Sequence, residues 1–441
     1  MDFEGLKNLM RENGIIGCGG AGFPSYAKLN QQVDTVIINC AECEPLLRLH
    51  RQLIEKKAYE VLETAELIAK TIGAKQVIVG LKVAYTKAIA ALEANIANFP
   101  LAKICTFKEI YPAGDEVILI YNTTGRIVKP GALPASVGVV VYNVETVYNV
   151  YRALKGKPVT HKFVTITGEV NDPRTFYAPI GSKIYGLVKR CKAAAIEDPE
   201  FLIGGPMMGR LGTDQDVVTK TTNAVILLDK NHPVSLRKRT KVSIDVKRAM
   251  AACCQCHYCT DMCPRHLLGY PIDPASLMRV VSNQDSHNIT PYLNAFYCSS
   301  CGVCEMYACH QGLSPRALLN SVKNQLRAAG IKPAQFEQTP VPIKDGELKR
   351  VPLARLRSRL DLEKYNHSAP MYDDPINAKE VVILLNQHIG APAISIVKVN
   401  DIVKEGDLIA KAKEDALSVN YHASIDGIIT DVTDRYITIH K

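Results

Sequence analysis

Two runs of closely spaced cysteines constrain this chain more than any other feature. The first has the spacing C-x2-C-x2-C-x3-C, is followed by a proline, and consists of Cys253, Cys256, Cys259 and Cys263. The second repeats the two short gaps, has four residues in its last gap, and consists of Cys298, Cys301, Cys304 and Cys309. Thiolates at such spacings reach three corners of one cubane cluster, and in chains with two clusters the fourth cysteine of each run binds the other cluster. The sequence therefore predicts two [4Fe–4S] clusters, one on Cys253, Cys256, Cys259 and Cys309 and the other on Cys298, Cys301, Cys304 and Cys263.

Structural zinc and disulfide bonds are the alternative uses of such cysteines. Structural zinc usually takes two separated pairs of ligands rather than runs of three. Disulfide bonds would require an oxidising compartment, which nothing in the sequence indicates. Cys254 is left over and is expected to be a buried or half-exposed thiol. His257, His266 and His310 lie beside cysteines, but we do not expect them as ligands because four thiolates already satisfy each cluster.

Length and composition are those of an ordinary globular protein. The 441 residues suggest about three domains, and 47% hydrophobic with 22% charged residues is a typical balance. No apolar stretch approaches the roughly 20 residues that a membrane helix needs. The first residues, Met-Asp-Phe-Glu, lack the pattern of a signal peptide. We expect a cytoplasmic protein without an integral membrane segment.

The net charge of +9 concentrates in residues 237–247 and 349–359, on either side of the cysteine runs. These two segments are either solvated linkers or a docking surface for an acidic partner. Nucleic acid is not an expected partner, because no aromatic interleaving or recognition motif accompanies the charge.

The first 156 residues alternate between helical and strand-like patterns. Helices are predicted at residues 3–12, 53–71, 84–98 and 145–154, and strands at residues 35–39, 76–80 and 137–142. Such alternation predicts a Rossmann-like α/β domain with a mostly parallel sheet.

Within this domain, four glycines in six residues form a loop: Gly17, Gly19, Gly20 and Gly22. The string formally matches G-x-G-x-x-G, but a dinucleotide site needs a strand before the loop and a helix after it. Here a helix-like segment precedes the loop and Pro24 follows it, so the ordinary Rossmann interpretation fails. Unobstructed backbone N–H groups would suit a phosphate or a flat ring. A structural turn remains the alternative.

Further strings follow the glycine loop along the chain. They are Phe23-Pro24 with Lys28, Asn39-x-x-Glu42-x-Glu44-Pro45, Tyr111-x-x-Gly114-Asp115-Glu116, and Asn143-Val144-Glu145-Thr146. This series resembles the NADH-oxidising flavoprotein subunit of respiratory complex I, and it resembles the C subunit of the Rnf complex more closely still. The resemblance implies that an FMN is surrounded by Gly17, Gly19, Gly20, Gly22, Lys28, Asn39, Glu42, Tyr111, Gly114, Asp115, Glu116 and Asn143. It also implies that Phe23 and Glu44 lie towards the nicotinamide as catalytic residues.

The residue types fit this role. Lys28 can pair with a phosphate, while amide and carboxylate groups can bind ribityl hydroxyls and ring edges. The sequence departs from the complex I subunit at Cys18, Ala41 and Tyr142, where that subunit has Arg, Asp and Asn. FMN is therefore expected, with NADH as its electron donor, whereas these departures weaken the argument that NADH binds in the same pose as in complex I.

Two modules are expected on either side of residue 240. Residues 157–230 have short β-branched runs and resemble a β-grasp module of the SLBB type. The string Gly204–Gly209 within it is interpreted as a turn that packs two methionines. Residues 240–330 are predicted to form a mostly helical, ferredoxin-type domain with both clusters, with helices at 274–281 and 315–328.

The last part of the chain divides into two segments. The proline- and charge-rich residues 331–375 are predicted to be a linker with extended pieces. Residues 376–441 resemble a barrel-sandwich hybrid of the lipoyl type. The stretch 422–427 offers no carrier lysine, which favours a docking or structural module. The predicted fold class is therefore a multidomain protein of mixed α/β and α+β type.

Domain order completes the resemblance. The barrel-sandwich module comes first in the Rnf C subunit but last here, as in the cobalamin reductases of propanediol-utilisation microcompartments. That resemblance implies an NADH-dependent oxidoreductase in which FMN and two [4Fe–4S] clusters deliver electrons to cobalamin. It also implies a location inside a bacterial microcompartment, with a cobalamin adenosyltransferase and shell proteins as partners. Cobalamin is expected as a transient substrate, because the sequence lacks the D-x-H-x-x-G motif.

Three other functions remain open from the sequence. The chain could be an electron-transfer subunit of an Rnf-like assembly, or it could serve an amino-acid reductase with another acceptor. From a different class, it could be a non-catalytic iron–sulfur scaffold whose flavin site has decayed.

Overall fold

The computed structural model describes residues 1–194 and 196–441. Its N-terminal part is built on a parallel sheet with the strand order β3-β2-β1-β5. The strands are β1 (Thr35–Asn39), β2 (Gln76–Lys82), β3 (Ala102–Phe107) and β5 (Val139–Asn143). Strands β1, β2 and β5 are apolar runs that are buried along nearly their whole length, as expected for a parallel sheet covered on both faces.

Successive side chains of β1 point to opposite faces of this sheet, and each face packs into a different hydrophobic core. Val36 and Ile38 pack into a core with four helices, α1 (Phe3–Glu12), α2 (Leu49–Ile72), α3 (Thr86–Ile96) and α5 (Val144–Leu154). Ile37 points the other way, into a second core with α4 (Glu116–Thr124) and helices of the cysteine region. The sheet therefore shares a continuous core with the part of the chain that carries the cysteines.

The helices and strands predicted for residues 1–156 are confirmed with shifted ends, and the sheet is parallel as predicted. The strands β3 and β4 (Ile110–Tyr111) and the helix α4 are not predicted from the sequence. The β-branched run at the start of α4 lacks helical periodicity. The Asp115 side chain nevertheless starts a helix there, because it accepts hydrogen bonds from the backbone N–H groups of Val117 and Ile118.

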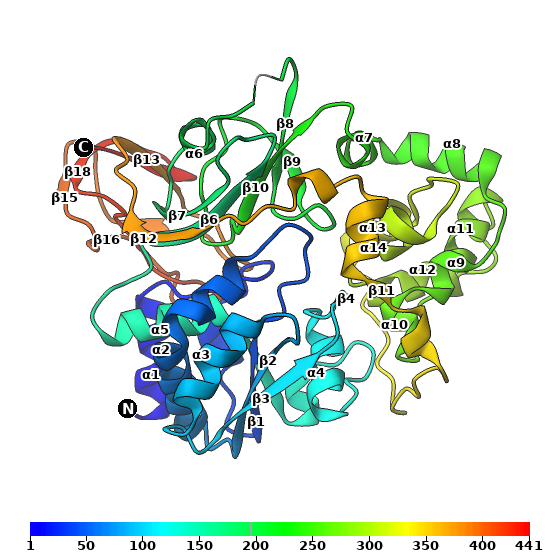
Figure 1. The fold of residues 1–441 in the computed structure, drawn as a ribbon, viewed down its shortest axis with the longest axis horizontal. Coiled ribbons are helices and arrows are strands. Elements are labelled where there is room, and N and C mark those ends of the chain that lie inside the picture. Colours follow the sequence, from blue (N-terminus) through cyan, green and yellow to red (C-terminus); the bar gives the residue numbers. More distant parts are fainter. Residues whose placement is uncertain (195) are drawn as a thin grey trace.

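A second sheet has the strand order β12-β7-β6-β10-β8-β9. Its strands are β6 (His161–Gly168), β7 (Arg174–Pro179), β8 (Pro199–Ile203), β9 (Arg210–Gly212), β10 (Ala224–Asp229) and β12 (Met371–Pro375). Helix α6 (Ile184–Arg190) packs on one face through Ile184, Leu187 and Val188. This sheet lies above the N-terminal domain in Figure 1.

The cysteine region is mostly helical, as predicted. Short helices surround the cysteine loops: α7 (Pro233–Arg239), α8 (Val242–Ala252), α9 (Tyr258–Asp261), α10 (Pro264–Leu267), α11 (Pro274–Ser282), α12 (Thr290–Asn294), α13 (Pro315–Ala328) and a π-helical turn at Cys304–Ala308. Several begin with proline at the first turn, where its missing N–H costs nothing.

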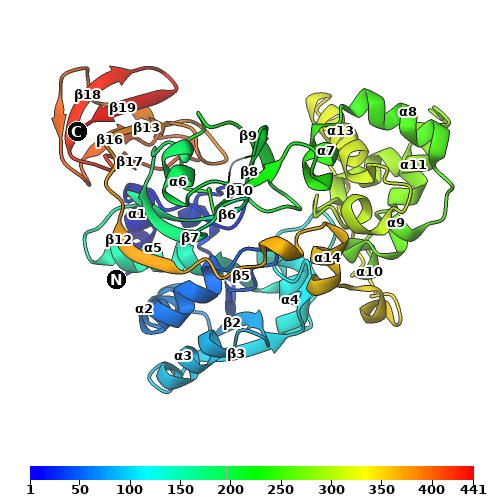
Figure 2. The same ribbon diagram turned by 45° about the horizontal axis from the view of Figure 1, so that its top comes forward.

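Residues 331–375 do more than connect two domains. Strand β11 (Val351–Pro352) pairs with β4 (Ile110–Tyr111) of the N-terminal domain, and β12 adds to the second sheet. Between them, α14 (Leu353–Arg359) buries Leu353 and Leu356, because its leucines face one core. The segment spans from the cysteine helices to β7 in both views (Figures 1 and 2). The basic stretches 237–247 and 349–359 lie mostly on helices and not in linkers, the first on α7 and α8 and the second on α14.

The C-terminal residues form two small facing sheets around a separate core. One contains β13 (Glu380–Leu384), β19 (Tyr436–His440), β18 (Gly427–Val432) and β15 (Ile402–Val403), and the other β14 (Ile394–Ser395), β16 (Leu408–Lys411) and β17 (Tyr421–His422). Buried Lys220 ties this module to the N-terminal domain, since its Nζ donates to the carbonyl oxygens of Gly14 and Asn420 at 2.7 and 3.2 Å. Among the described residues, no helix combines the length and apolarity needed to cross a membrane.

Candidate functional site

The glycine loop and the carboxyl ends of β1 and β5 surround a cavity of about 380 Å³, which we call the glycine-loop cavity. Asn39 ends β1 and Asn143 ends β5, and both line it. Ligands of open parallel sheets bind at this end of the strands, and the volume is that of a small-molecule site.

Almost every residue that the sequence assigned to FMN and nicotinamide lines this cavity. They are Gly17, Gly19, Gly20, Gly22, Phe23, Lys28, Asn39, Glu42, Glu44, Gly114, Asp115, Glu116 and Asn143. Tyr111 is not among the lining residues. Its neighbour Pro112 lines the cavity instead, and the Tyr111 phenol donates to the carbonyl oxygen of Cys301 at 2.6 Å.

Hydrogen bonds fix the polar groups of the wall. Lys28 Nζ lies 2.9 Å from Glu116 Oε1 and also donates to the Val141 carbonyl. Asn39 Nδ2 donates to the Gly114 carbonyl at 3.0 Å, which ties two of the predicted strings together. Asn143 Oδ1 accepts from the Glu145 N–H and caps α5. The wall thus offers one ammonium group that can pair with a phosphate, and amides and carboxylates that can bind polyol hydroxyls.

Glycine is required by space at two loop positions. A Cβ on Gly19 would lie 2.5 Å from Asn143 Nδ2. Gly22 has a φ of 74°, and a Cβ there would lie 2.8 Å from the Gln387 carbonyl oxygen of the C-terminal module. The C-terminal module therefore packs directly against the glycine loop.

Two carboxylates in the wall are shielded from solvent: Glu42 is buried and Glu44 is half-buried. Burial raises the pKa of Glu42 to about 7, although its Oε2 accepts from the His50 N–H at 3.1 Å. Its Oε1 is buried without a partner among the described residues, so this oxygen fits a polar group on a ligand. Burial also raises the pKa of Glu44, whose oxygens accept from the Met207 and Met208 N–H groups at 2.8 and 2.7 Å.

The sequence analysis missed several lining residues, including His50, Met208, Asn223, Ser299 and Cys301. Met208 had a signal in the string Gly204–Gly209, which does form a turn but also reaches the cavity. No sequence signal pointed to Asn223, because it lies directly before β10 of the second sheet, far along the chain from the glycine loop. Burial lowers the pKa of His50 to about 3, so this imidazole is neutral beside Asn143.

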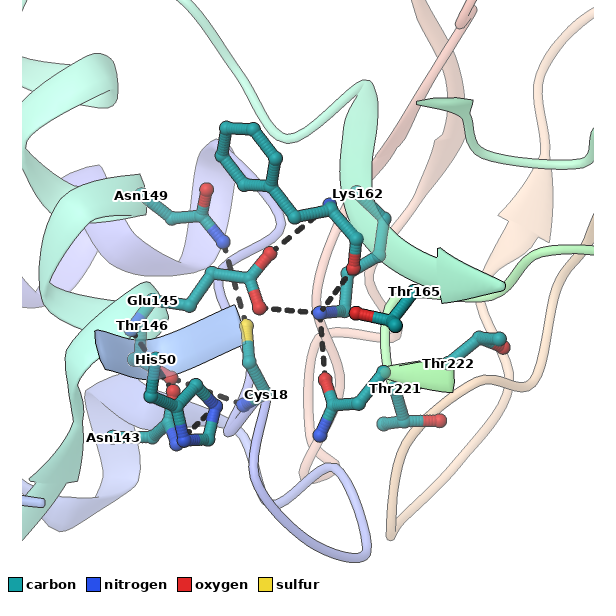
Figure 3. A network of polar contacts seen from close by, with 12 residues as sticks. Cys18, His50, Asn143, Glu145, Thr146, Asn149, Lys162, Thr165, Thr221 and Thr222 are labelled. Carbon is teal, nitrogen blue, oxygen red and sulfur yellow. Dashed lines mark hydrogen bonds and ion pairs between the residues drawn. The ribbon is translucent and has the colours of Figure 1, made fainter. Parts of the chain in front are cut away.

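A buried ion pair holds Asn223. Lys162, on β6, pairs with Glu145 on α5, and both side chains are almost inaccessible (Figure 3). The same ammonium group donates to Asn223 Oδ1 at 2.7 Å. Because a lysine ammonium can only donate, the amide oxygen of Asn223 must face it. The amide nitrogen is left to face elsewhere, and Asn223 lines the cavity.

The cysteines surround two further, narrow cavities. One is lined by Cys253, Cys254, Cys256, Cys259 and Cys309, and we call the four of these at cluster spacing, without Cys254, the outer set. The other is lined by Cys263, Cys298, Cys301 and Cys304, the inner set. Burial raises the pKa values of Cys259 and Cys263 to about 12, and neighbouring thiols of the same set add to this. Within the described ranges, no three His, Cys, Asp or Glu side chains approach as closely as a single metal ion requires.

The inner set adjoins the glycine-loop cavity. Cys301 and Ser299 line both cavities. Arg265, next to Cys263 in the chain, pairs with Asp115 at 2.9 Å across the same boundary. Cys256 and Cys254 of the outer region are exposed, whereas Cys263, Cys301 and Cys304 are buried. The glycine-loop cavity thus adjoins the buried inner set, and the outer set lies nearer the surface.

Comparisons with known families agree with this arrangement. Residues 10–152 match the Nuo51 FMN-binding domain, residues 252–314 the 4Fe-4S dicluster domain, and residues 364–441 the RnfC barrel sandwich hybrid domain. The chain is thus a multidomain α/β flavoprotein with FMN and 4Fe-4S cofactors.

Three relatives illustrate the similarity. Cobalamin reductase PduS of Citrobacter freundii is 38% identical over 442 residues, which cover 99% of this chain and 97% of that protein. The C subunit of the Na(+)-translocating ferredoxin:NAD(+) oxidoreductase complex of Acetobacterium woodii is 32% identical over 65% of this chain and 64% of that protein. Among solved structures, an NAD+-reducing [NiFe]-hydrogenase chain has a TM-score of 0.48 at 19% identity, covering 76% of this chain and 64% of that one. With 38% identity over almost its whole length, this oxidoreductase belongs to the cobalamin reductase PduS family.

Proposed function

We propose that this protein oxidises NADH and delivers the electrons singly to cobalamin, reducing cob(III)alamin and cob(II)alamin to cob(I)alamin. One NADH would then reduce two cob(II)alamin molecules and yield NAD⁺ and one proton. Bound FMN would accept two electrons and release them one at a time, and each cluster would carry one. The observation that carries the proposal is the shared wall of the cavities: Cys301 lines both the glycine-loop cavity and the inner cysteine cavity.

We also propose roles for individual residues, which the family resemblance suggests and their place in the cavity wall supports. Lys28 would bind the FMN phosphate, and Glu42 and Asn143 would bind polar groups of the flavin. Gly17 and Gly19 would leave backbone room for the flavin, and Phe23 and Glu44 would lie on the nicotinamide side. The outer set would hold one [4Fe–4S] cluster and the inner set the other, with Cys309 and Cys263 as the exchanged fourth ligands. The grouping of the thiols around two cavities supports this assignment.

The finer organisation is also a proposal. We assign residues 1–156 to the FMN and NADH domain, 157–230 to an SLBB-type β-grasp module, 240–330 to the dicluster domain, 331–375 to a connecting segment and 376–441 to the barrel-sandwich module. A location inside a microcompartment, with a cobalamin adenosyltransferase and shell proteins as partners, is proposed from the family resemblance.

The test separates flavin reduction from delivery to cobalamin. In anaerobically reconstituted protein, a Cys256→Ala Cys301→Ala variant should still bleach its flavin with NADH in stopped flow, while cob(II)alamin reduction falls to background. Cys105→Ala, which removes a half-buried thiol on β3 that lines none of the three cavities, is the matched control and should behave as wild type. Circular dichroism checks that the flavin domain remains folded. Full cobalamin reduction by the double variant would refute the route through the clusters.

A further inference from the structure

A wide surface groove of about 680 Å³ lies beside the outer cysteine set. Its walls come from α9, the π-helical turn Cys304–Ala308 and α14, and they include Tyr258, Tyr307, His310, Arg355 and Arg359. The helix α14 lies against the cysteine helices in both views, at the end of the molecule away from the C-terminal module (Figures 1 and 2). This groove is separate from the glycine-loop cavity and shares no lining residue with it.

The groove lies next to two outer cysteines. Tyr258 immediately precedes Cys259, and His310 immediately follows Cys309. The rings of Tyr258 and His310 meet edge to face with their centroids 4.8 Å apart, which joins the two cysteine loops at the groove. Tyr258 is half exposed and His310 is exposed, so a molecule in the groove would contact the residues that flank the outer set.

The charge of the groove has one sign. Arg355 and Arg359 are exposed and lie four residues apart on α14, so they share one face of that helix. No Asp or Glu is among the residues that line the groove in the described part of the chain. Burial lowers the pKa of Arg237, and the positive charge of nearby Arg359 lowers it further. Paired guanidinium groups beside aromatic rings suit a ligand with both a phosphate and a flat ring system.

We propose that this groove is the electron-exit site, where a corrinoid acceptor docks with its nucleotide phosphodiester on Arg355 and Arg359. This inference rests on the proposed function and specifies where its acceptor binds. Tyr258 and Tyr307 contact the apolar part of the acceptor, and one electron passes from the outer cysteine site to Co(II), giving Co(I). No atom or proton is transferred in this step, and NADH oxidation supplies the electron. Two arginines beside exposed aromatic rings complement a phosphodiester attached to a large ring system, which favours the corrinoid itself as the occupant.

The test compares two acceptors that differ in the phosphodiester. Cob(II)alamin carries it, and cob(II)inamide lacks the nucleotide arm. In Arg355→Ala Arg359→Ala protein, the Kd for cob(II)alamin from equilibrium dialysis and the KM for its reduction should rise about tenfold or more. The kcat at saturation and the rate of flavin bleaching by NADH should stay as in wild type. The KM for cob(II)inamide should not change. Arg435→Ala, an exposed arginine in the C-terminal module, is the matched control and should change none of these values.

The outcomes separate this inference from the proposed function. If wild type reduces cob(II)alamin and the double variant binds and reduces it with unchanged Kd and KM, the groove is not the exit site, while the function stands. If the variant loses both acceptors equally, the phosphodiester is not what the arginines bind, and the inference fails. If wild type with loaded clusters does not reduce cob(II)alamin at all, the proposed function fails, and this inference fails with it.

Discussion

The phenol of Tyr111 donates a hydrogen bond of 2.6 Å to the carbonyl oxygen of Cys301, and both groups are buried. The residue after Tyr111 lines the glycine-loop cavity, and Cys301 lines both this cavity and the inner cysteine cavity. This bond therefore fixes the inner cysteine loop against the flavin domain. Arg265 and Asp115 form a second link beside it, at 2.9 Å.

Replacing Tyr111 with Phe tests the importance of this link. The change leaves a buried carbonyl without its donor and should lower the free energy of unfolding by about 1–3 kcal/mol. Urea unfolding of the reconstituted protein measures this value. Tyr185→Phe is the control, because Tyr185 is 54% exposed and should be unaffected by loss of its hydroxyl. Equal stability of both variants would show that the Cys301 carbonyl finds another donor.

The proposal that each cysteine run supplies the fourth ligand of the other cluster can be tested by comparing the spectra of single cysteine variants. Cys309→Ala should give the same electron paramagnetic resonance spectrum as Cys256→Ala, because both cysteines belong to the outer set. Cys263→Ala should instead match Cys301→Ala, from the inner set. Each variant should keep about four iron atoms per chain where wild type has about eight. If Cys263→Ala matched Cys256→Ala, each run would bind its own cluster, and bound zinc would rule out both arrangements.

The glycine loop predicts a steric effect on flavin binding. Gly19→Val would place its side chain where Asn143 Nδ2 now lies, so it should weaken FMN binding at least tenfold. Gly186→Val is a matched change on α6, where a Cβ meets no atom within 4 Å, and it should retain the flavin. Fluorescence titration of flavin-free protein with FMN measures both. Acid should release the flavin intact, because the binding is non-covalent. Full FMN affinity of the Gly19 variant would show that the loop is only a structural turn.

Because the pKa of Glu42 is raised in the folded state, we expect the stability of the flavin-free protein to depend on pH. Burial raises its pKa from 4.5 to about 7, so the folded state favours the protonated carboxyl. The stabilisation is fully present below the unfolded pKa and is lost as the pH rises through about 7. Between about pH 5 and pH 8 the loss should approach 3 kcal/mol at most, since one pKa unit corresponds to about 1.4 kcal/mol.

Glu42→Gln removes this titration, so the variant should gain stability relative to wild type as the pH rises. Urea unfolding at several pH values gives the difference between the two proteins, in which the other titrating groups cancel. Buried His50 would act in the opposite direction, because its lowered pKa costs stability as the pH falls. A difference that does not change with pH would show that Glu42 is ionised in the fold.

Local patterns explain what the sequence could predict. The cysteine spacing, the glycine loop and the asparagines at the ends of β1 and β5 lie within short segments, and the structure brings most of them to the predicted cavities. Asn223 and Cys301 could not be assigned to the glycine-loop cavity, because only the packing of three distant segments brings them there. The sequence of residues 331–375 resembles a linker, because prolines and charged residues dominate it. The two leucines that α14 buries are too few to give a clear helical pattern.

The buried pair of Lys162 and Glu145 is another feature that only the packing reveals (Figure 3). Lys162→Met would leave the Glu145 carboxylate buried without its cation and should lower the free energy of unfolding by about 3–5 kcal/mol. Lys411→Met, which breaks an exposed pair with Glu414, should cost less than about 1 kcal/mol and serves as the control.

Adding Glu145→Gln to Lys162→Met should recover most of the lost stability, because no buried charge then remains uncompensated. Recovery of the fold need not restore the site. Asn223 loses the donor that orients its amide in both variants, so FMN affinity should stay reduced in the double variant although stability returns. Urea unfolding and flavin titration of the same samples separate the two effects. If the double variant recovered both stability and FMN affinity, Asn223 would have no role in binding the flavin. If it were no more stable than Lys162→Met, the loss would come from packing around the lysine and not from the unpaired carboxylate.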